Sequence, residues 1–295
     1  QDYNRRFTDR ELMSILLHAL EKIEVLFEEK EPDILVGFIS DINILESPKI
    51  KFFLQVTTIF IFVYILKLQI GSTRIFLLDL LLENIIFSYF FTIFCFVNVI
   101  NGTNFIDGLN GLVLGYYLAI ICVLFKLGLL TTVISQNYLI IFLILSLAFL
   151  LILNTLEHLY LGDSGAYSIA FMVSFLLILI YKNTLYVSPF FIILMLWYPC
   201  FENLFSILRK FRFKRSPLLP DNNHLHQLLF VFFKKKTKIN QKYLNNFSSF
   251  IIILYNLIIF FLASLNIGNT QFQILLVVFN IVIYLFVYLR ILSFL

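Results

Sequence analysis

The stretch Asn98-Val-Ile-Asn-Gly-Thr-Asn-Phe-Ile-Asp-Gly-Leu-Asn-Gly111 interrupts a region that is otherwise almost entirely apolar. Polar side chains recur in it at every third position, with glycines among them; they are Asn98, Asn101, Asn104, Asp107 and Asn110. Glycine lets the backbone turn tightly and lets a ligand approach it closely. We therefore predict a polar turn that binds a ligand, against the simpler alternative that Asp107 only caps a helix.

The composition around this stretch is that of an integral membrane protein. Of the 295 residues, 60% are hydrophobic and 14% are charged, and the mean hydropathy is +0.92. Apolar runs of about twenty residues, the length that crosses a bilayer as a helix, recur along most of the chain. We expect an all-α, polytopic membrane helix bundle with about eight transmembrane helices, at about 52–67, 76–98, 109–130, 138–156, 165–181, 186–207, 247–265 and 272–292.

The chain divides into two parts. Residues 1–33 are polar, and apolar side chains at helical spacing from Leu12 to Leu26 predict an amphipathic helix that does not cross the membrane. Residues 34–295 form the predicted transmembrane domain. Its polar loops are expected near 37–51, 98–111, 157–165 and 208–246.

These four loops are predicted to share one face of the membrane, because counting one crossing per helix returns the chain to the same side at each of them. The loop 208–246 is rich in lysine and arginine, whereas the opposite connections contribute little beyond Arg74 and Lys182. We therefore expect a multi-pass protein of the cytoplasmic (inner) membrane with these loops in the cytoplasm. A basic loop without a recognisable module gives no reason to expect nucleic-acid binding.

Acidic and histidine side chains on this face are candidates for chemistry. Asp107 and Asp163 both lie on glycine-flanked turns, and Asp41 comes from the same side. Mg²⁺ prefers carboxylate and phosphate oxygens and commonly takes only one or two protein carboxylates. His224 and His226 lack the further ligands that zinc requires, so a phosphorylated substrate is the better interpretation.

Three segments of the chain resemble one family of membrane enzymes. They are Asn-Phe-Ile-Asp-Gly-Leu-Asn-Gly-Leu112, Leu-Gly-Asp-Ser-Gly-Ala-Tyr167, and Phe-Glu202-Asn-Leu-Phe-Ser-Ile-Leu-Arg209 with the following Arg-Ser-Pro-Leu-Leu-Pro-Asp221-Asn-Asn-His-Leu-His226. In order, spacing and sidedness they resemble the polyprenyl-phosphate N-acetylhexosamine-1-phosphate transferases, which also include the phospho-N-acetylmuramoyl-pentapeptide transferases. The Asp-x-x-His-Leu-His ending is closer to the WecA-like branch.

The resemblance implies transfer of a sugar 1-phosphate, from a UDP-N-acetylhexosamine to membrane polyprenyl phosphate, with release of UMP. This is the first membrane step of a cell-surface glycan pathway. The resemblance implies Mg²⁺, or Mn²⁺, held by Asp107 and Asp163, with Asp41 as a third catalytic residue. The implied substrate-binding residues are Asn101, Asn104, Asn110, Asp221, His224, His226, Arg215, Lys49 and Lys51. The sequence leaves open whether the protein forms a homodimer.

The chain departs from the family pattern at three places. Ser40 stands where the family usually has the first of two aspartates, and Asn110 stands where many members have aspartate. A phosphate monoester is already largely ionised near neutral pH, its second pKa being about 6, so Ser40 need not abolish activity. The family's first two spans are not visible before residue 37. We expect either a truncated or rearranged chain, or that residues 9–30 replace those spans.

Two other classes of function stay open at this point. A transporter or channel would distribute polar residues across the depth of the membrane, whereas here they gather at one surface. A non-catalytic relative would bind the lipid carrier or a partner without turnover, which fits Ser40 and the missing first spans.

Overall fold

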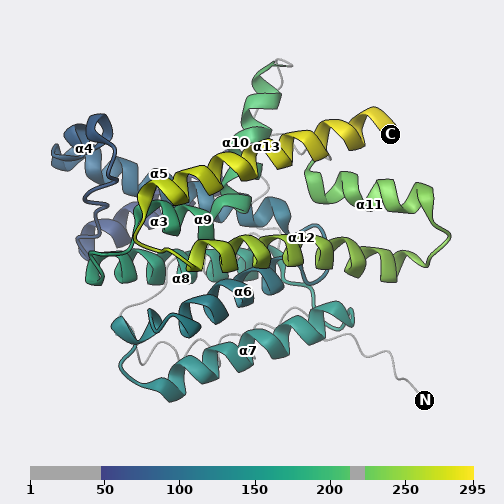
Figure 1. The fold of residues 1–295 in the computed structure, drawn as a ribbon, viewed down its shortest axis with the longest axis horizontal. Coiled ribbons are helices and arrows are strands. Elements are labelled where there is room, and N and C mark those ends of the chain that lie inside the picture. Colours follow the sequence, from purple (N-terminus) through teal and green to yellow (C-terminus); the bar gives the residue numbers. More distant parts are fainter. Residues whose placement is uncertain (1–47, 213–222) are drawn as a thin grey trace.

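The structure is a computed structural model that describes residues 48–212 and 223–295 as a bundle of helices (Figure 1). The predicted amino-terminal helix, Ser40, Asp41, Arg215 and Asp221 lie outside the described residues. The longer elements are α3 (Pro48–Ile65), α5 (Ile85–Ile106), α6 (Leu112–Lys126), α7 (Asn137–Thr155), α8 (Gly162–Asn183), α10 (Trp197–Arg212), α11 (Leu225–Lys236), α12 (Gln241–Ser264) and α13 (Thr270–Phe294). The shorter ones are α4 (Phe76–Leu82), the 3₁₀ turn η1 (Leu130–Thr132) and α9 (Pro189–Met195).

The all-helical fold class is confirmed, and by length and composition fewer of the described helices than predicted qualify as membrane spans. In the described ranges, five helices are long and apolar enough: α5, α7, α8, α12 and α13. The number rises to six if the bent pair α9 and α10 is one span. The predicted span 109–130 is shorter than expected, since α6 has only 15 residues.

The predicted span 76–98 is two helices instead of one. The side chain of Asn84 accepts hydrogen bonds from the backbone N–H groups of Ile86 and Phe87, at 3.0 and 3.2 Å, and so starts α5. An asparagine in this position satisfies N–H groups that would otherwise lack a partner at the start of the helix. At its other end α5 continues past Asn98 to Ile106, so the polar turn itself begins only at Asp107.

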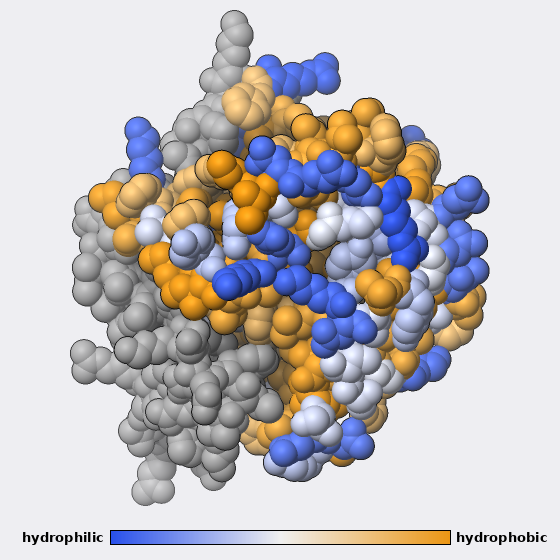
Figure 2. Space-filling model, turned by 90° about the vertical axis from the view of Figure 1, so that its left-hand side faces the viewer, coloured by the Kyte–Doolittle hydropathy of each residue, from blue (hydrophilic) through white to orange (hydrophobic). Residues whose placement is uncertain are grey.

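Asp79 in α4 organises the connection from α3. Its carboxylate accepts hydrogen bonds from Ser72, Thr73 and Arg74, at 2.6 to 3.1 Å. Desolvation raises the pKa of Asp79, but the hydrogen bonds from Thr73, Ser72 and Arg74 outweigh it and lower the pKa overall. This end of the bundle, which carries α4, has a band of hydrophilic residues bordered by hydrophobic ones (Figure 2).

The predicted span 186–207 is bent by 76° between α9 and α10. Ser188 starts α9 by accepting a hydrogen bond from Phe190 N at 3.3 Å, and Pro189 follows at the first helical position. Pro199 lies in the first turn of α10, where the missing N–H of proline costs no hydrogen bond. The bend directs α10 out of the bundle (Figure 1).

The helix α5 occupies the centre of the packing, between α3, α8 and α10. Gly102 makes the contact with α10 possible, because a Cβ atom there would lie 2.0 Å from the carbonyl oxygen of Pro199. Asn203 of α10 also donates a hydrogen bond to the side-chain oxygen of Asn98, at 2.7 Å. Thus Asn98, the first polar residue of the opening stretch, joins two helices.

Candidate active site

The turn after α5 is fixed by two asparagines from other helices. Asn245 of α12 accepts a hydrogen bond from the backbone N–H of Asn110 at 2.7 Å. Asn154 of α7 accepts one from Gly111 N and donates one to Leu159 O, the latter at 2.8 Å. Gly111 has φ +77°, in the left-handed region that favours glycine. These contacts hold the turn beside the loop between α7 and α8.

Glu202 anchors the segment His224–His226, called the histidine segment below. This carboxylate is fully buried in α10, 3.0 Å from His224 Nδ1, and it accepts a hydrogen bond from Leu225 N, also at 3.0 Å. His224 precedes the first residue of α11, a helix that lies inside the predicted loop 208–246. A buried carboxylate at the start of a helix satisfies free N–H groups and stabilises the helix dipole.

His226 lies against the turn that carries Asp107. A Cβ atom on Gly108 would be 2.6 Å from His226 Nε2, so the ring occupies the space that this glycine leaves. The side chain is fully buried, and neither ring nitrogen has a hydrogen-bond partner among the described residues. Desolvation lowers the pKa of His226 to about 4; His224 adds to this effect and Glu202 opposes it. The ring is therefore neutral at pH 7, with one nitrogen able to donate and the other able to accept a hydrogen bond.

An aromatic and a basic side chain complete this part of the site. The rings of His224 and His226 stack with their centroids 5.7 Å apart, and Phe105 lies 5.2 Å from His224. The ammonium group of Lys210 lies 5.6 Å from the centre of the Phe105 ring, although its side chain is almost entirely buried. A buried cation beside planar rings suits an anionic, aromatic ligand.

The helix α3 contributes a third wall. Lys51 Nζ lies 3.7 Å from the carboxylate of Asp163 in the first turn of α8. One helical turn further along α3, Gln55 accepts a hydrogen bond from Asn101 Nδ2 at 2.9 Å. The predicted residues Asn101, Lys51 and Asp163 are thus brought together, whereas Lys49 is exposed on the first turn of α3.

A sequence profile described as Glycosyl transferase family 4 matches residues 33–181, about half of the chain, including Asp41, Asp107 and Asp163. This chain belongs to glycosyl transferase family 4. The family 4 chain is 31% identical over 155 residues to the probable undecaprenyl-phosphate N-acetylglucosaminyl 1-phosphate transferase of Bacillus subtilis, covering 49% of this chain and 41% of the relative. It is 31% identical over 186 residues to the decaprenyl-phosphate N-acetylglucosaminephosphotransferase of Mycolicibacterium smegmatis, covering 56% of this chain and 45% of the relative. The chain therefore spans less than half the length of these relatives. No solved structure matches it.

The acidic, histidine and cysteine side chains of this family 4 chain limit which metal ions it could bind. Within residues 48–212 and 223–295, no three His, Cys, Asp or Glu side chains form a group that could hold a metal ion. Mg²⁺ needs fewer protein ligands, since one or two carboxylates with water and substrate phosphates suffice. Asp107 and Asp163 are both partly exposed, and they have the chemistry for this. The residues present therefore fit Mg²⁺ better than zinc.

Sequence reasoning missed several residues of the candidate site. Glu202, Gln55, Asn154 and Asn245 all hold predicted site residues in place. The signal that could have found Glu202 and Gln55 is a polar side chain within an apolar helix, which is costly unless it has a partner or a function. Asn104, in the last turn of α5, and Asn110, in the turn that follows, are half-buried.

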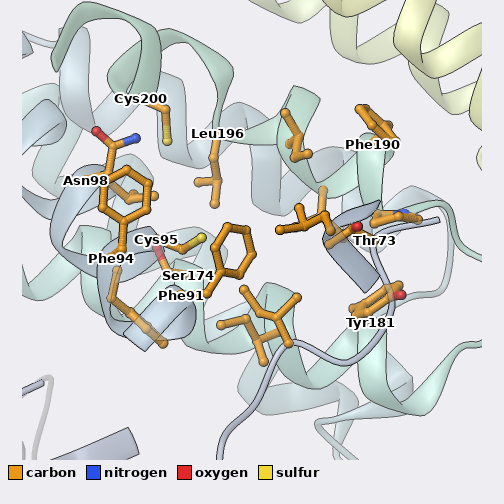
Figure 3. A pocket seen from close by; sticks show the side chains of 18 of the residues that line it. Thr73, Phe91, Phe94, Cys95, Asn98, Ser174, Tyr181, Phe190, Leu196 and Cys200 are labelled. Carbon is orange, nitrogen blue, oxygen red and sulfur yellow. The ribbon is translucent and has the colours of Figure 1, made fainter. Parts of the chain in front are cut away.

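An apolar cavity of about 320 Å³ lies along α5 and extends away from the site (Figure 3). Asn98 and Cys200 lie toward one end, and Thr73 and Tyr181 lie toward the other. The residues between them are almost all apolar, including Phe91, Phe94 and Leu196. The cavity can therefore accommodate a hydrocarbon group.

Proposed function

We propose that the protein transfers a sugar 1-phosphate from a UDP-N-acetylhexosamine to membrane polyprenyl phosphate and releases UMP. The main support for this proposal is that three parts of the chain lie together at one end of an apolar bundle: the turn with Asp107, the histidine segment, and α3 with Lys51. His226 lies against Gly108 in the Asp107 turn, and Lys51 reaches Asp163. The relatives bear names of transferases that act on undecaprenyl and decaprenyl phosphate, which supports the same reaction here.

The reaction joins two anions. An oxygen of the lipid phosphate attacks the β-phosphorus of the UDP-sugar, a new P–O bond forms, and the bond to the bridging oxygen of UMP breaks. Because the lipid phosphate is already largely ionised near neutral pH, its second pKa being about 6, the attacking oxygen needs little further activation. The protein must chiefly position the reactants and offset their charge.

Different residues of this chain are assigned to positioning the reactants and to offsetting their charge. Lys51 supplies positive charge on the α3 wall, and we assign the lipid phosphate to that side. His226, neutral and lacking a partner among the described residues, offers a hydrogen bond on the Gly108 side, where we place the UDP-sugar. Asn101, Asn104 and Asn110 line the turn between them, while Asp221, Arg215 and Asp41 are further proposed contributors outside the described residues.

Asp107 and Asp163 would hold Mg²⁺, or Mn²⁺. When bound, the ion offsets the negative charge of the phosphates. Both carboxylates lie at helix ends, Asp107 after α5 and Asp163 in the first turn of α8. The apolar cavity along α5 offers a place for the isoprenoid chain, and we propose that the site faces the cytoplasm because the basic residues gather at this end.

The test is an activity measurement with paired variants. Membranes containing the protein should form a lipid-linked sugar pyrophosphate from UDP-N-acetylhexosamine, polyprenyl phosphate and Mg²⁺. Asp107→Asn and Asp163→Asn should each lower kcat about 100-fold or more, because each removes a charge from the proposed metal site. Glu157→Gln is the matched control. Glu157 lies in the loop before α8 and pairs with Lys242 of α12, so this substitution should leave the activity unchanged.

Equal activity in the wild type, Asp107→Asn and Asp163→Asn would contradict the proposal. Binding of both substrates without turnover in the wild type would instead identify a non-catalytic relative.

A further inference from the structure

Gln55 lies on the α3 wall of the site, one helical turn after Lys51. Side chains four residues apart lie on the same face of a helix. Lys51 and Gln55 therefore both face α5 and α8, where they contact Asp163 and Asn101, respectively. Gln55 is only 3% exposed, so its amide must find its hydrogen-bond partners inside the protein or on a ligand.

The orientation of the Gln55 amide follows from its neighbours. Asn101 Nδ2 lies 2.9 Å from the carbonyl oxygen of Val97 and 2.9 Å from Gln55 Oε1. The carbonyl of Val97 can only accept, so the Asn101 atom facing it must be the amide nitrogen, whose two hydrogens are then both used. The Gln55 atom that faces this nitrogen must be oxygen. Hence the Gln55 amide nitrogen points elsewhere.

That nitrogen, Gln55 Nε2, is buried and has no hydrogen-bond partner among the described residues. A buried donor without an acceptor is unfavourable, and native proteins keep few of them. The nearest charge on the same helix face is the ammonium group of Lys51, whose distance of 3.7 Å from Asp163 exceeds that of a close charged hydrogen bond. An amide donor next to an ammonium group suits a phosphate oxygen.

We propose that Gln55 is a substrate-binding residue that donates an amide N–H to a phosphate oxygen of a substrate held at Lys51. This inference rests on the proposed transferase function and extends it to a residue within an apolar helix. The assignment of the lipid phosphate to the Lys51 side makes polyprenyl phosphate the expected source of this oxygen. The pyrophosphate of the UDP-sugar offers the same chemistry, and the test distinguishes the two. Gln55 also holds Asn101, so the test must separate binding from support.

Gln55→Glu makes that separation. The carboxylate keeps an oxygen to accept the hydrogen bond of Asn101, but it replaces the donor with an anion facing the phosphate. We expect the KM for one substrate to rise about 10- to 100-fold, the loss of one hydrogen bond to a charged group. A rise for polyprenyl phosphate alone assigns the lipid phosphate, and a rise for the UDP-sugar alone assigns the pyrophosphate.

Further variants keep the result interpretable. Gln55→Met adds no charge but removes both the donor and the oxygen that accepts the hydrogen bond of Asn101. If Gln55→Glu does not fold, Gln55→Met is therefore compared with Asn101→Ala, which removes the contact with Asn101 and leaves the Gln55 donor. A larger rise in KM in Gln55→Met supports the contact with the phosphate, and an equal or smaller rise overturns it. Thr57→Ala is the control on the same helix, because its hydroxyl is used by the carbonyl of Phe53, and both KM values should stay unchanged.

Unchanged KM values for both substrates in folded Gln55→Glu, or a fall in kcat alone, would overturn the inference and leave the transferase function intact. Absence of turnover in the wild type would instead count against the proposed function. In that case, the affinity for a short isoprenyl phosphate shows whether Gln55 contacts a substrate phosphate. The UDP-sugar is tested in the same way. Binding of either ligand that is at least tenfold weaker in Gln55→Glu supports the contact, and equal binding of both ligands overturns it.

Discussion

His226 shows how burial sets the properties of a single side chain. Its ring is enclosed between the Asp107 turn and His224, while Glu202 holds the segment from below through His224 and Leu225 N. Glu202 is fully buried, and its charge is tolerated because its oxygens have these partners. The enclosure favours the neutral imidazole, which suits a hydrogen bond to an uncharged part of a nucleotide sugar.

This burial predicts a pH dependence of stability. The pKa of His226 is lowered by desolvation from 6.5 to about 4, so below pH 6.5 the unfolded chain takes up a proton that the folded protein does not. The stabilisation from the neutral ring is complete above pH 6.5 and is lost as the pH falls toward 4, by up to about 3 kcal/mol. Thermal unfolding in detergent between pH 7.5 and 4.5 should show this slope.

His226→Phe should flatten that slope, because phenylalanine fills the space without titrating. His158→Phe is the matched control, since His158 is exposed, and its slope should equal that of the wild type. A slope that stays the same in His226→Phe would show that His226 is not the group responsible.

At the scale of helices, the contact between α5 and α10 positions both the Asp107 turn and Glu202. Gly102 allows this contact, and Asn203 adds a hydrogen bond to Asn98. After the 76° bend that follows α9, α10 carries Glu202, which contacts His224 and accepts a hydrogen bond from Leu225 N.

Gly102→Ala should therefore disturb both stability and activity. The new Cβ atom would lie 2.0 Å from the carbonyl oxygen of Pro199, and neither backbone can yield without moving a helix. We expect a loss of about 1–3 kcal/mol or more in the free energy of unfolding, read as a lower thermal midpoint. Gly71→Ala is the control, because a Cβ atom there meets nothing within 4 Å. Equal midpoints for the two variants would refute this close packing.

The sequence predicted the helical class and the residues of the polar turn, but not the breaks within helices. Hydropathy averages over a window, so it read 76–98 as one span and did not register Asn84 as the start of α5. It also missed the bend before α10, and it missed the helix α11 because this helix has only 12 residues and ends in three lysines. Gln55 and Glu202 stand out as polar residues among apolar ones, but their structural roles could not be predicted, because each depends on a partner distant in the sequence, Asn101 and His224 respectively.

At the scale of the whole molecule, apolar helices carry a polar site at one end. The described helices expose large hydrophobic side chains along α7, α12 and α13, as expected for contact with lipid. Three of the predicted loops contact one another: Lys242 near the start of α12 reaches Glu157 before α8, and His226 reaches Gly108. A soluble nucleotide sugar and a membrane lipid could both reach such a site.

The identity of the released nucleotide shows most directly whether the β-phosphorus of the UDP-sugar is attacked. We expect the protein to release UMP, in a one-to-one ratio with lipid-linked sugar pyrophosphate and only when polyprenyl phosphate is present. Chromatography of the reaction with a uridine-labelled donor measures this. Release of UDP, with sugar joined to the lipid through a single phosphate, would contradict the account.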